Sequence, residues 1–197
     1  TGESKFTIEE FPREERGTKI SFKLKDEAKE FSDEYRVQEI IKRYSNFADF
    51  PIHVNGEQVN TISALWQKNK SEVTDEELNE FYKFISNDFN SQLGHLQLSI
   101  EGQVNFKAMV FIPETAPINF MREENLKSLQ LYANRIFIQD DCKELLPEYL
   151  RFVAGVVDTE DLSLNVSREV TQASPVMAKI KDVLTGRILS LLEDWAK

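Results

Sequence analysis

Cysteine and histidine are nearly absent from this sequence. Cys142 is the single cysteine, so the chain cannot form an internal disulfide, and such a composition suits a reducing compartment. We therefore expect a cytoplasmic protein. A nucleophilic role for Cys142 would need a histidine beside it, so we expect a small side chain at a helix start instead. His53 and His95 lie far apart in the sequence without metal-ligand spacing, and we expect no metal site.

Three further absences exclude whole classes of function. The seven glycines never reach the spacing GxxxxGK[ST] or GxGxxG, so the chain has no phosphate-binding loop of these types. No window approaches the roughly 18 apolar residues of a transmembrane helix, and residues 1–10 lack the features of a secretory signal. The net charge of −10 argues against nucleic acid, because phosphate contacts need clustered Lys and Arg. We expect neither a membrane nor a nucleic-acid partner.

Apolar residues, by contrast, are plentiful enough for one sizeable core. Hydrophobic residues make up 41% of the chain, which excludes intrinsic disorder. Residues 9–17 are charged and contain proline and glycine, which predicts a boundary between a tail at 1–16 and one globular unit at 17–197. The missing initiator Met and the apolar final helix favour a segment excised from a longer protein.

The first half of the globular unit predicts alternating strands and helices. Residues 18–24 alternate polar and apolar side chains, which is typical of a half-buried strand. Residues 26–44 carry apolar side chains at helical spacing and predict a helix. Asn55-Gly56 supplies the positive φ angles of a tight hairpin, so we expect strands on both sides, at 52–54 and 57–61.

The second half predicts a helix, more strands and a final long helix. Thr74 and Glu77 form the pattern of a capping box. Apolar side chains follow it at helical spacing, at Leu78, Phe81, Tyr82 and Ile85. Further strands are expected at 96–100, 104–112, 128–132 and 135–139, and further helices at 147–157 and 174–195. The sum is an α/β (α+β) layered sandwich, in which a mixed sheet is covered by helices.

Acidic clusters offer weak candidates for chemistry. Asp140 with Asp141, and Asp158 with Glu160 and Asp161, could hold a divalent cation or act as acid and base. Acids that precede a helix also stabilise its N-terminal end, by about 0.3–1 kcal/mol. We favour this structural explanation for both clusters.

Residues 161–172 contain a more specific candidate. Apolar and polar side chains alternate over 161–166, as in a short extended segment, and Ser167 can cap a turn that presents Arg168. An arginine on an anchored loop can reach a phosphate, because guanidinium offers a fixed fork of donors and stays charged. A pair between Arg168 and Glu169 is the alternative that these residues leave open.

Several motifs in one order resemble the heat-shock protein 90 family of chaperones. GVVDTEDLSLNVSRE, at 155–169, resembles the family's GVVDSxDLxLNxSRE. The motif KRYSNF, at 42–47, with FPI, at 50–52, resembles its KKYSxFxxFPI. EGQ and FIP, at 101–103 and 111–113, resemble parts of its VEGQxxFxAxxFIPxxAP, and RGTKI, at 16–20, is similar to the end of its ATP-binding domain. The short loops resemble the bacterial HtpG branch.

The resemblance implies both a fold and a site. The fold would be that of the large subdomain of the family's middle domain, which is similar to the second domain of ribosomal protein S5. ATP with Mg²⁺ would be bound mainly by the preceding N-terminal domain, which lies outside residues 17–197. Arg168 would reach the γ-phosphate as an arginine finger in cis, Gln172 would help to position nucleotide or water, and Asn165 would fix the loop at the nucleotide.

The resemblance also implies partners. These are the N-terminal ATP-binding domain of the same chain and client proteins, which would be bound through exposed apolar surface. Phe89 and Trp66 are candidates for that surface, although a lone tryptophan is more often a core residue. We expect this segment to be monomeric and inactive alone, and its parent to be a homodimer. The alternatives are a passive protein-interaction module and an autonomous enzyme, for which no nucleophile–base spacing exists.

Overall fold

A mixed five-stranded sheet forms the centre of the computed structural model, which describes residues 8–10, 12, 16–60, 63–115, 128–162 and 174–197. In spatial order its strands are β3 (Gln92–Ile100), β4 (Phe106–Pro113), β7 (Ala154–Thr159), β5 (Leu129–Ala133) and β6 (Ile136–Gln139). Neighbours are antiparallel except β5 and β7, which run parallel. The predicted α/β class with a mixed sheet is confirmed.

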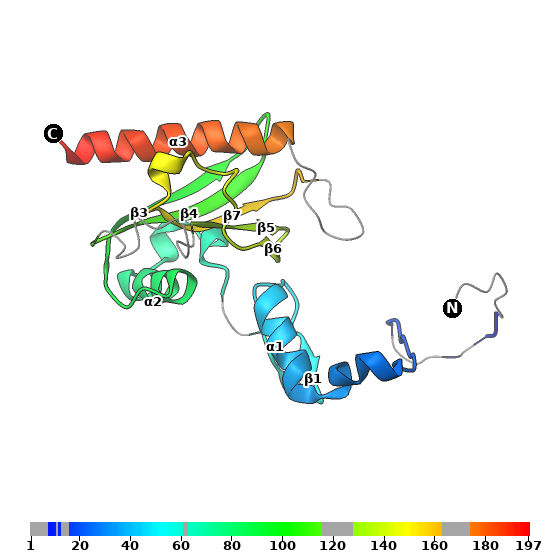
Figure 1. Cartoon of the computed structure of the whole chain (residues 1–197). Helices are drawn as coiled ribbons and strands as arrows, with labels where there is room; N and C mark the ends of the chain where they lie inside the picture. The colour runs from blue at the N-terminus through cyan, green and yellow to red at the C-terminus, as the bar shows by residue number, and fades with distance from the viewer. Residues whose placement is uncertain (1–7, 11, 13–15, 61–62, 116–127, 163–173) are drawn as a thin grey trace.

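Helices cover both faces of this sheet (Figure 1). Helix α3 (Pro175–Trp195) lies along one face, while α2 (Asp75–Ser86) lies against the other with the short helix η2 (Leu65–Gln67). Successive side chains of a strand point to opposite faces, so Val110 packs into the core under α3 while Met109 and Phe111 pack into the core under α2. The molecule therefore has one core on each side of the sheet.

Helix α2 begins where the capping box predicts. The Glu77 N–H donates to Thr74 Oγ1 at 3.2 Å, and the Thr74 N–H donates to Glu77 Oε2 at 3.1 Å. All four predicted apolar positions are buried, namely Leu78, Phe81, Tyr82 and Ile85. A second short helix, η3 (Lys70–Glu72), precedes it. Helix α3 is also confirmed, with Ser174 as N-cap and Pro175 at its start.

The helix predicted over 147–157 is wrong. Only η4 (Glu148–Leu150) is helical, and Ala154–Thr159 form the central strand β7. Every residue of β7 is buried, and its apolar, partly β-branched run suits a strand between two others. Gly155 also allows β4 to approach closely, because a Cβ there would lie 2.8 Å from Val110 Cα.

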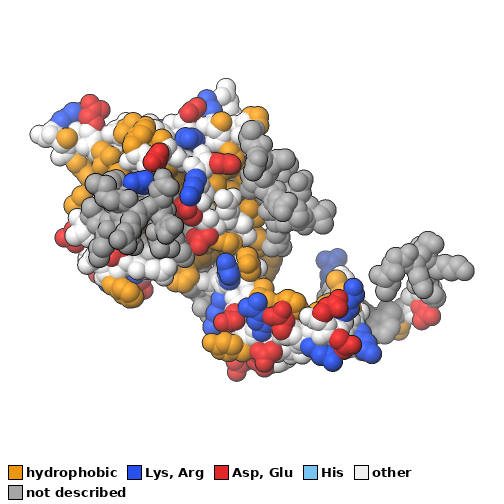
Figure 2. Space-filling model, viewed as in Figure 1, with side chains coloured by type: hydrophobic (Ala, Val, Ile, Leu, Met, Phe, Trp, Pro, Cys, Tyr) orange, Lys and Arg blue, Asp and Glu red, His pale blue; other side chains and the backbone are white. Residues whose placement is uncertain are grey.

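The N-terminal part differs from prediction in two places. Residues 18–24 form no regular strand, and Ile20 and Phe22 are exposed. A period-two pattern needs a partner to bury against, and the described residues pair no strand with it. The helix over 26–44 is split into η1 (Asp26–Ser32) and α1 (Glu34–Tyr44), because Asp33 leaves the helix and caps α1 by accepting from the Arg36 N–H at 2.9 Å. Figure 2 shows basic and acidic side chains interspersed over this segment.

The Asn55-Gly56 hairpin is confirmed but short. Its strands are β1 (His53–Val54) and β2 (Glu57–Gln58), and φ is 50° at Asn55 and 90° at Gly56. Within the described ranges, no helix is both long and apolar enough to cross a membrane.

Candidate functional site

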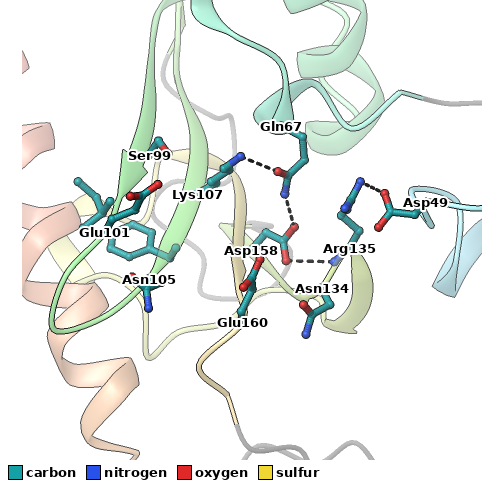
Figure 3. A pocket seen from close by; sticks show the side chains of 12 residues that line it. Asp49, Gln67, Ser99, Glu101, Asn105, Lys107, Asn134, Arg135, Asp158 and Glu160 are labelled. Carbon is teal, nitrogen blue, oxygen red and sulfur yellow. Dashed lines mark hydrogen bonds and ion pairs between the residues drawn. The ribbon is translucent and has the colours of Figure 1, made fainter.

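Asp158 is the centre of a polar cluster near the carboxyl end of β7. It is only 5% exposed, and its carboxylate accepts three hydrogen bonds. Oδ2 accepts from Trp66 Nε1 at 2.8 Å. Oδ2 also accepts from Gln67 Nε2 at 3.0 Å, while Oδ1 accepts from the Arg135 N–H at 3.1 Å (Figure 3). These donors come from η2 and from the β5–β6 turn. The carboxylate therefore holds three separate parts of the fold together.

Lys107 adds a positive charge to this cluster. It is the cross-strand partner of Asp158, and its Nζ donates to Gln67 Oε1 at 2.8 Å. The Gln67 amide thus bridges the lysine and the carboxylate. A cavity of about 280 Å³ opens beside these groups, and Glu101 and Glu160 also line it. Its charges are mixed, and its buried carboxylate is already engaged as an acceptor, so the cavity offers no activated nucleophile.

The predicted role of helix-capping charge is wrong for Asp158, while for Glu160 and Asp161 it stays a prediction, because residues 163–173 lie outside the described ranges. Asp158 belongs to strand β7, and no helix follows it among the described residues. Asp161 accepts from the Asn105 N–H at 2.5 Å and from Asn105 Nδ2 at 3.3 Å. Thr159 Oγ1 donates to the Asn105 carbonyl at 2.7 Å and accepts from the Asp161 N–H at 3.2 Å. These contacts tie the end of β7 to the turn between β3 and β4.

Asp140 and Asp141 also precede no α-helix. Strand β6 ends just before them, and Asp141, with φ of 52°, lies in a turn where its Oδ1 accepts from the Ser128 N–H at 3.2 Å. The explanation by helix charge is therefore wrong here too.

The three site residues inferred from the resemblance are Asn165, Arg168 and Gln172. All three lie in residues 163–173, outside the described residues. The described chain on either side is well anchored. Before residue 163, Leu162 packs against the core beyond the Asp161 contacts, and after residue 173 helix α3 buries Met177 within its first turn.

Trp66 is a core residue rather than an exposed client contact. Its side chain is 1% exposed and packs against Phe47 at a ring-centroid distance of 4.7 Å. Phe89, by contrast, is 89% exposed. Of the two client-surface candidates, only Phe89 is therefore accessible.

Replacing Trp66 with phenylalanine should lower the free energy of unfolding by about 2–3 kcal/mol. The change removes an N–H donor from a buried carboxylate, and hydrogen bonds to charged groups contribute about 1.5–3 kcal/mol. Urea unfolding of the wild-type chain and the variant measures this difference. Phe89→Ala, at an exposed position, is the control and should change the value by less than about 0.5 kcal/mol. Equal effects of the two variants would contradict the assigned hydrogen bond.

Cys142 was predicted at a helix start, and this prediction is wrong. The residue lies in the turn after β6 and is buried in the core. Its side chain is 1% exposed, and its N–H donates to the Leu129 carbonyl at 2.8 Å. Burial raises the pKa of the Cys142 thiol to about 11. The thiolate is the reactive form, and the raised pKa keeps the thiol protonated near neutral pH. The buried position therefore does not favour nucleophilic chemistry.

We expect Cys142 to react with a thiol-specific disulfide reagent at pH 8 only after the chain unfolds. The raised pKa keeps the folded thiol protonated, and burial excludes the reagent. The thiol ionises near pH 9 in the unfolded chain and near pH 11 in the folded chain. The free energy of unfolding should therefore be unaffected by Cys142 below pH 9 and should fall as the pH rises towards about 11. Fast labelling of the native chain, monitored spectroscopically, would contradict the buried position.

Both histidines lie in strands. His53 is exposed on β1, while burial and then Lys70 lower the pKa of His95 on β3. The described ranges contain no group of three or more His, Cys, Asp or Glu side chains that could hold a metal ion.

Sequence reasoning missed the residues that surround Asp158. The available signal was an acid at the end of the buried run 153–157, which places a carboxylate where a central strand ends. Lys107 and Arg135 carry no local signal, because their partners are distant in the sequence.

Comparison with known proteins agrees with the motifs. The family model described as Hsp90 protein matches residues 53–197. The chaperone protein HtpG of Chlorobium phaeobacteroides is 63% identical over 194 residues, which cover 97% of this chain and 31% of the relative. HtpG of Chlorobaculum tepidum is 54% identical over 100% of this chain and 32% of its own length, and HtpG of Shigella dysenteriae is 40% identical over 100% and 33%. The chain spans about a third of the length of these curated relatives.

Proposed function

The chain belongs to the heat-shock protein 90 family, and from this premise we propose how it works within a longer ATP-dependent chaperone. It is a middle-domain segment that supplies Arg168 to the γ-phosphate of ATP, which is bound with Mg²⁺ in a preceding domain. The relatives that carry the name chaperone support a chaperone segment. The ATP-linked role of Arg168 is our proposal.

The observation that carries this proposal is the anchoring on both sides of residues 163–173. Asp161 is held by two hydrogen bonds from Asn105 on one side, and α3 starts directly from Ser174 on the other. Both anchor points belong to the unit formed by the five-stranded sheet with α2, η2 and α3, which we call the sheet unit. An arginine carried between two such points can be delivered to a phosphate by movement of whole domains.

The chemistry of the side chains suits this role. A guanidinium group forms bidentate, charge-assisted hydrogen bonds with phosphate oxygens and stabilises charge that develops during phosphoryl transfer. Gln172 would position nucleotide or water, and Asn165 would hold the loop at the nucleotide. Because the ATP pocket belongs to the preceding domain, we expect the 197-residue chain alone not to hydrolyse ATP.

Client proteins are the second class of partner in the proposal. The sheet unit exposes large apolar side chains near α2 and β3, which suits contact with unfolded chains; they are Phe84, Phe89 and Leu93. We further propose that the parent works as a homodimer in the cytoplasm and that the preceding domain of the same chain is the partner of Arg168.

ATP turnover by the full-length parent with Arg168→Ala tests the proposal. A fall of about 10²-fold supports it, since one group that stabilises the transition state typically has an effect of that size. Unchanged turnover overturns it and leaves a passive protein-interaction module.

A further inference from the structure

Arg135 connects two parts of the chain that are far apart in the sequence. Its N–H donates to Asp158 Oδ1, near the end of β7, and its guanidinium forms an ion pair with Asp49 Oδ1 (Figure 3). Asp49 lies between α1 and β1. It belongs to residues 45–60, which lead into the sheet unit from the N-terminal side and which we call the incoming segment. One residue therefore touches both the incoming segment and the strand that leads to residues 163–173.

The backbone at Arg135 is unusual for an arginine. Asn134 and Arg135 form the β5–β6 turn with φ of 49° and 64°. Glycine is the residue that best suits the second of these positions, because a Cβ is unfavourable at positive φ. The local turn therefore gives no reason for an arginine at this position. The ion pair between the Arg135 side chain and Asp49 does give a reason.

The loop that holds Asp49 is itself fixed. Asn60 is only 6% exposed, and its side chain binds three backbone groups of this loop. Asn60 Oδ1 accepts from the Ile52 N–H at 2.6 Å, while Nδ2 donates to the carbonyls of Phe50 at 2.9 Å and Ala48 at 3.3 Å. The ion pair consequently joins two ordered pieces rather than two free side chains, which lowers the entropy lost on pairing.

An aromatic contact also joins α1 to the β5–β6 hairpin. Tyr44, the last residue of α1, meets Phe137 of β6 edge-to-face, with ring centroids 5.8 Å apart. No residue of α1 is fully buried, and Tyr44 itself is 37% exposed. Three residues further on, Phe47 is 4% exposed and packs in the core under α2 against Trp66 and Tyr132, so the incoming segment is held there as well as at the β5–β6 hairpin.

We propose that the Asp49–Arg135 ion pair couples the incoming segment to the end of β7. The pair fixes the direction in which the chain from the preceding domain meets the strand that leads to Arg168. Arg135 is then a positioning residue, which acts through Asp49 and Asp158 and does not touch ATP. This inference rests on the proposed function, since the coupling affects turnover only if Arg168 must meet ATP in the preceding domain.

Arg135→Gly in the full-length parent separates the turn from the ion pair. Glycine completes an Asn-Gly turn and adopts the positive φ without strain, so the melting temperature should hold or rise. Turnover, kcat, should fall roughly twofold to fivefold at unchanged KM, the effect expected when a half-exposed ion pair is lost. Arg135→Lys keeps the charge and should restore most of the rate.

Two further variants sharpen the test. Asp49→Asn should lower kcat to the same extent, and the double variant Asp49→Asn with Arg135→Gly should show no additional loss, because both changes remove one contact. Arg151→Gln is the matched control, since it removes a pair with Glu148 that precedes the opposite end of β7. It should leave kcat unchanged.

Amide hydrogen exchange of residues 45–60, measured on the same samples, reports the contact independently of ATP. Exchange should be faster in Asp49→Asn and in Arg135→Gly but not in Arg151→Gln. Unchanged kcat in Arg135→Gly, or losses that add in the double variant, would overturn the coupling. Failure of the proposed function has another signature: turnover then survives Arg168→Ala, while exchange still reports whether the ion pair holds the segment.

Discussion

Replacing Gly155 with alanine is expected to lower the free energy of unfolding by about 3–5 kcal/mol. The added methyl group would lie 2.8 Å from Val110 Cα and still closer to the Met109 carbonyl oxygen, both of which are backbone atoms of the adjacent strand. Strand β4 cannot move away without disturbing β3 and both cores. Overpacking typically costs about 1–3 kcal/mol, and the backbone at φ of 155° adds strain for any residue with a Cβ.

Gly186→Ala is the matched control for this prediction. Gly186 lies within α3, and a Cβ there would meet no atom within 4 Å. Alanine is the better helix former by about 1 kcal/mol, so this variant should be more stable than the wild-type chain. Urea unfolding with both variants gives the two values under one set of conditions. A Gly155→Ala chain as stable as the Gly186→Ala chain would contradict the close strand approach.

The elements that the sequence predicts correctly are those with a complete local signal. Helix α2 has its capping box and its buried face within one short stretch, and the β1–β2 hairpin has Asn-Gly at its turn. Such features depend on neighbours a few residues apart, which local sequence patterns contain.

Strand β7 is not predictable in this way. The run from Leu145 to Val157 contains both a helical spacing of apolar residues and a β-branched end, and local preference does not decide between them. The decision is made by β4 and β5, which lie on either side of β7 and exclude a helix between them. The isolated pattern at 18–24 fails for the converse reason, since the described residues offer it no pairing strand.

The candidate site also contains residues that a local motif indicates and residues that only the fold brings together. Arg168, Gln172 and Asn165 were inferred from a contiguous motif, and they remain predictions because they lie outside the described residues. The cluster around Asp158 needed the fold, because Trp66 and Gln67 come from a segment some 90 residues earlier, at separations of 92 and 91. The motif therefore yields a prediction about Arg168, while the structure shows the contacts of the Asp158 cluster at the end of β7.

Replacing Arg168 with alanine in the full-length parent should lower ATP turnover by about 10²-fold, the usual effect of removing one group that stabilises transition-state charge. Nucleotide affinity should change little, because ATP is held mainly by the preceding domain in our proposal. Melting temperature should also hold, since the change leaves the Asp161–Asn105 contacts and the start of α3 untouched. Turnover, affinity and melting are measured on the same preparation.

Arg168→Lys and Arg187→Ala complete this experiment. Lysine keeps a positive charge but lacks the planar fork of donors, so it should recover only part of the lost rate. Arg187 is exposed on α3, and its replacement should leave turnover unchanged. Loss of melting temperature in step with turnover would assign Arg168 to packing, because a phosphate-contacting side chain affects the reaction without affecting the fold. A selective loss of turnover, partly restored by lysine, is the result that a phosphate-contacting arginine requires.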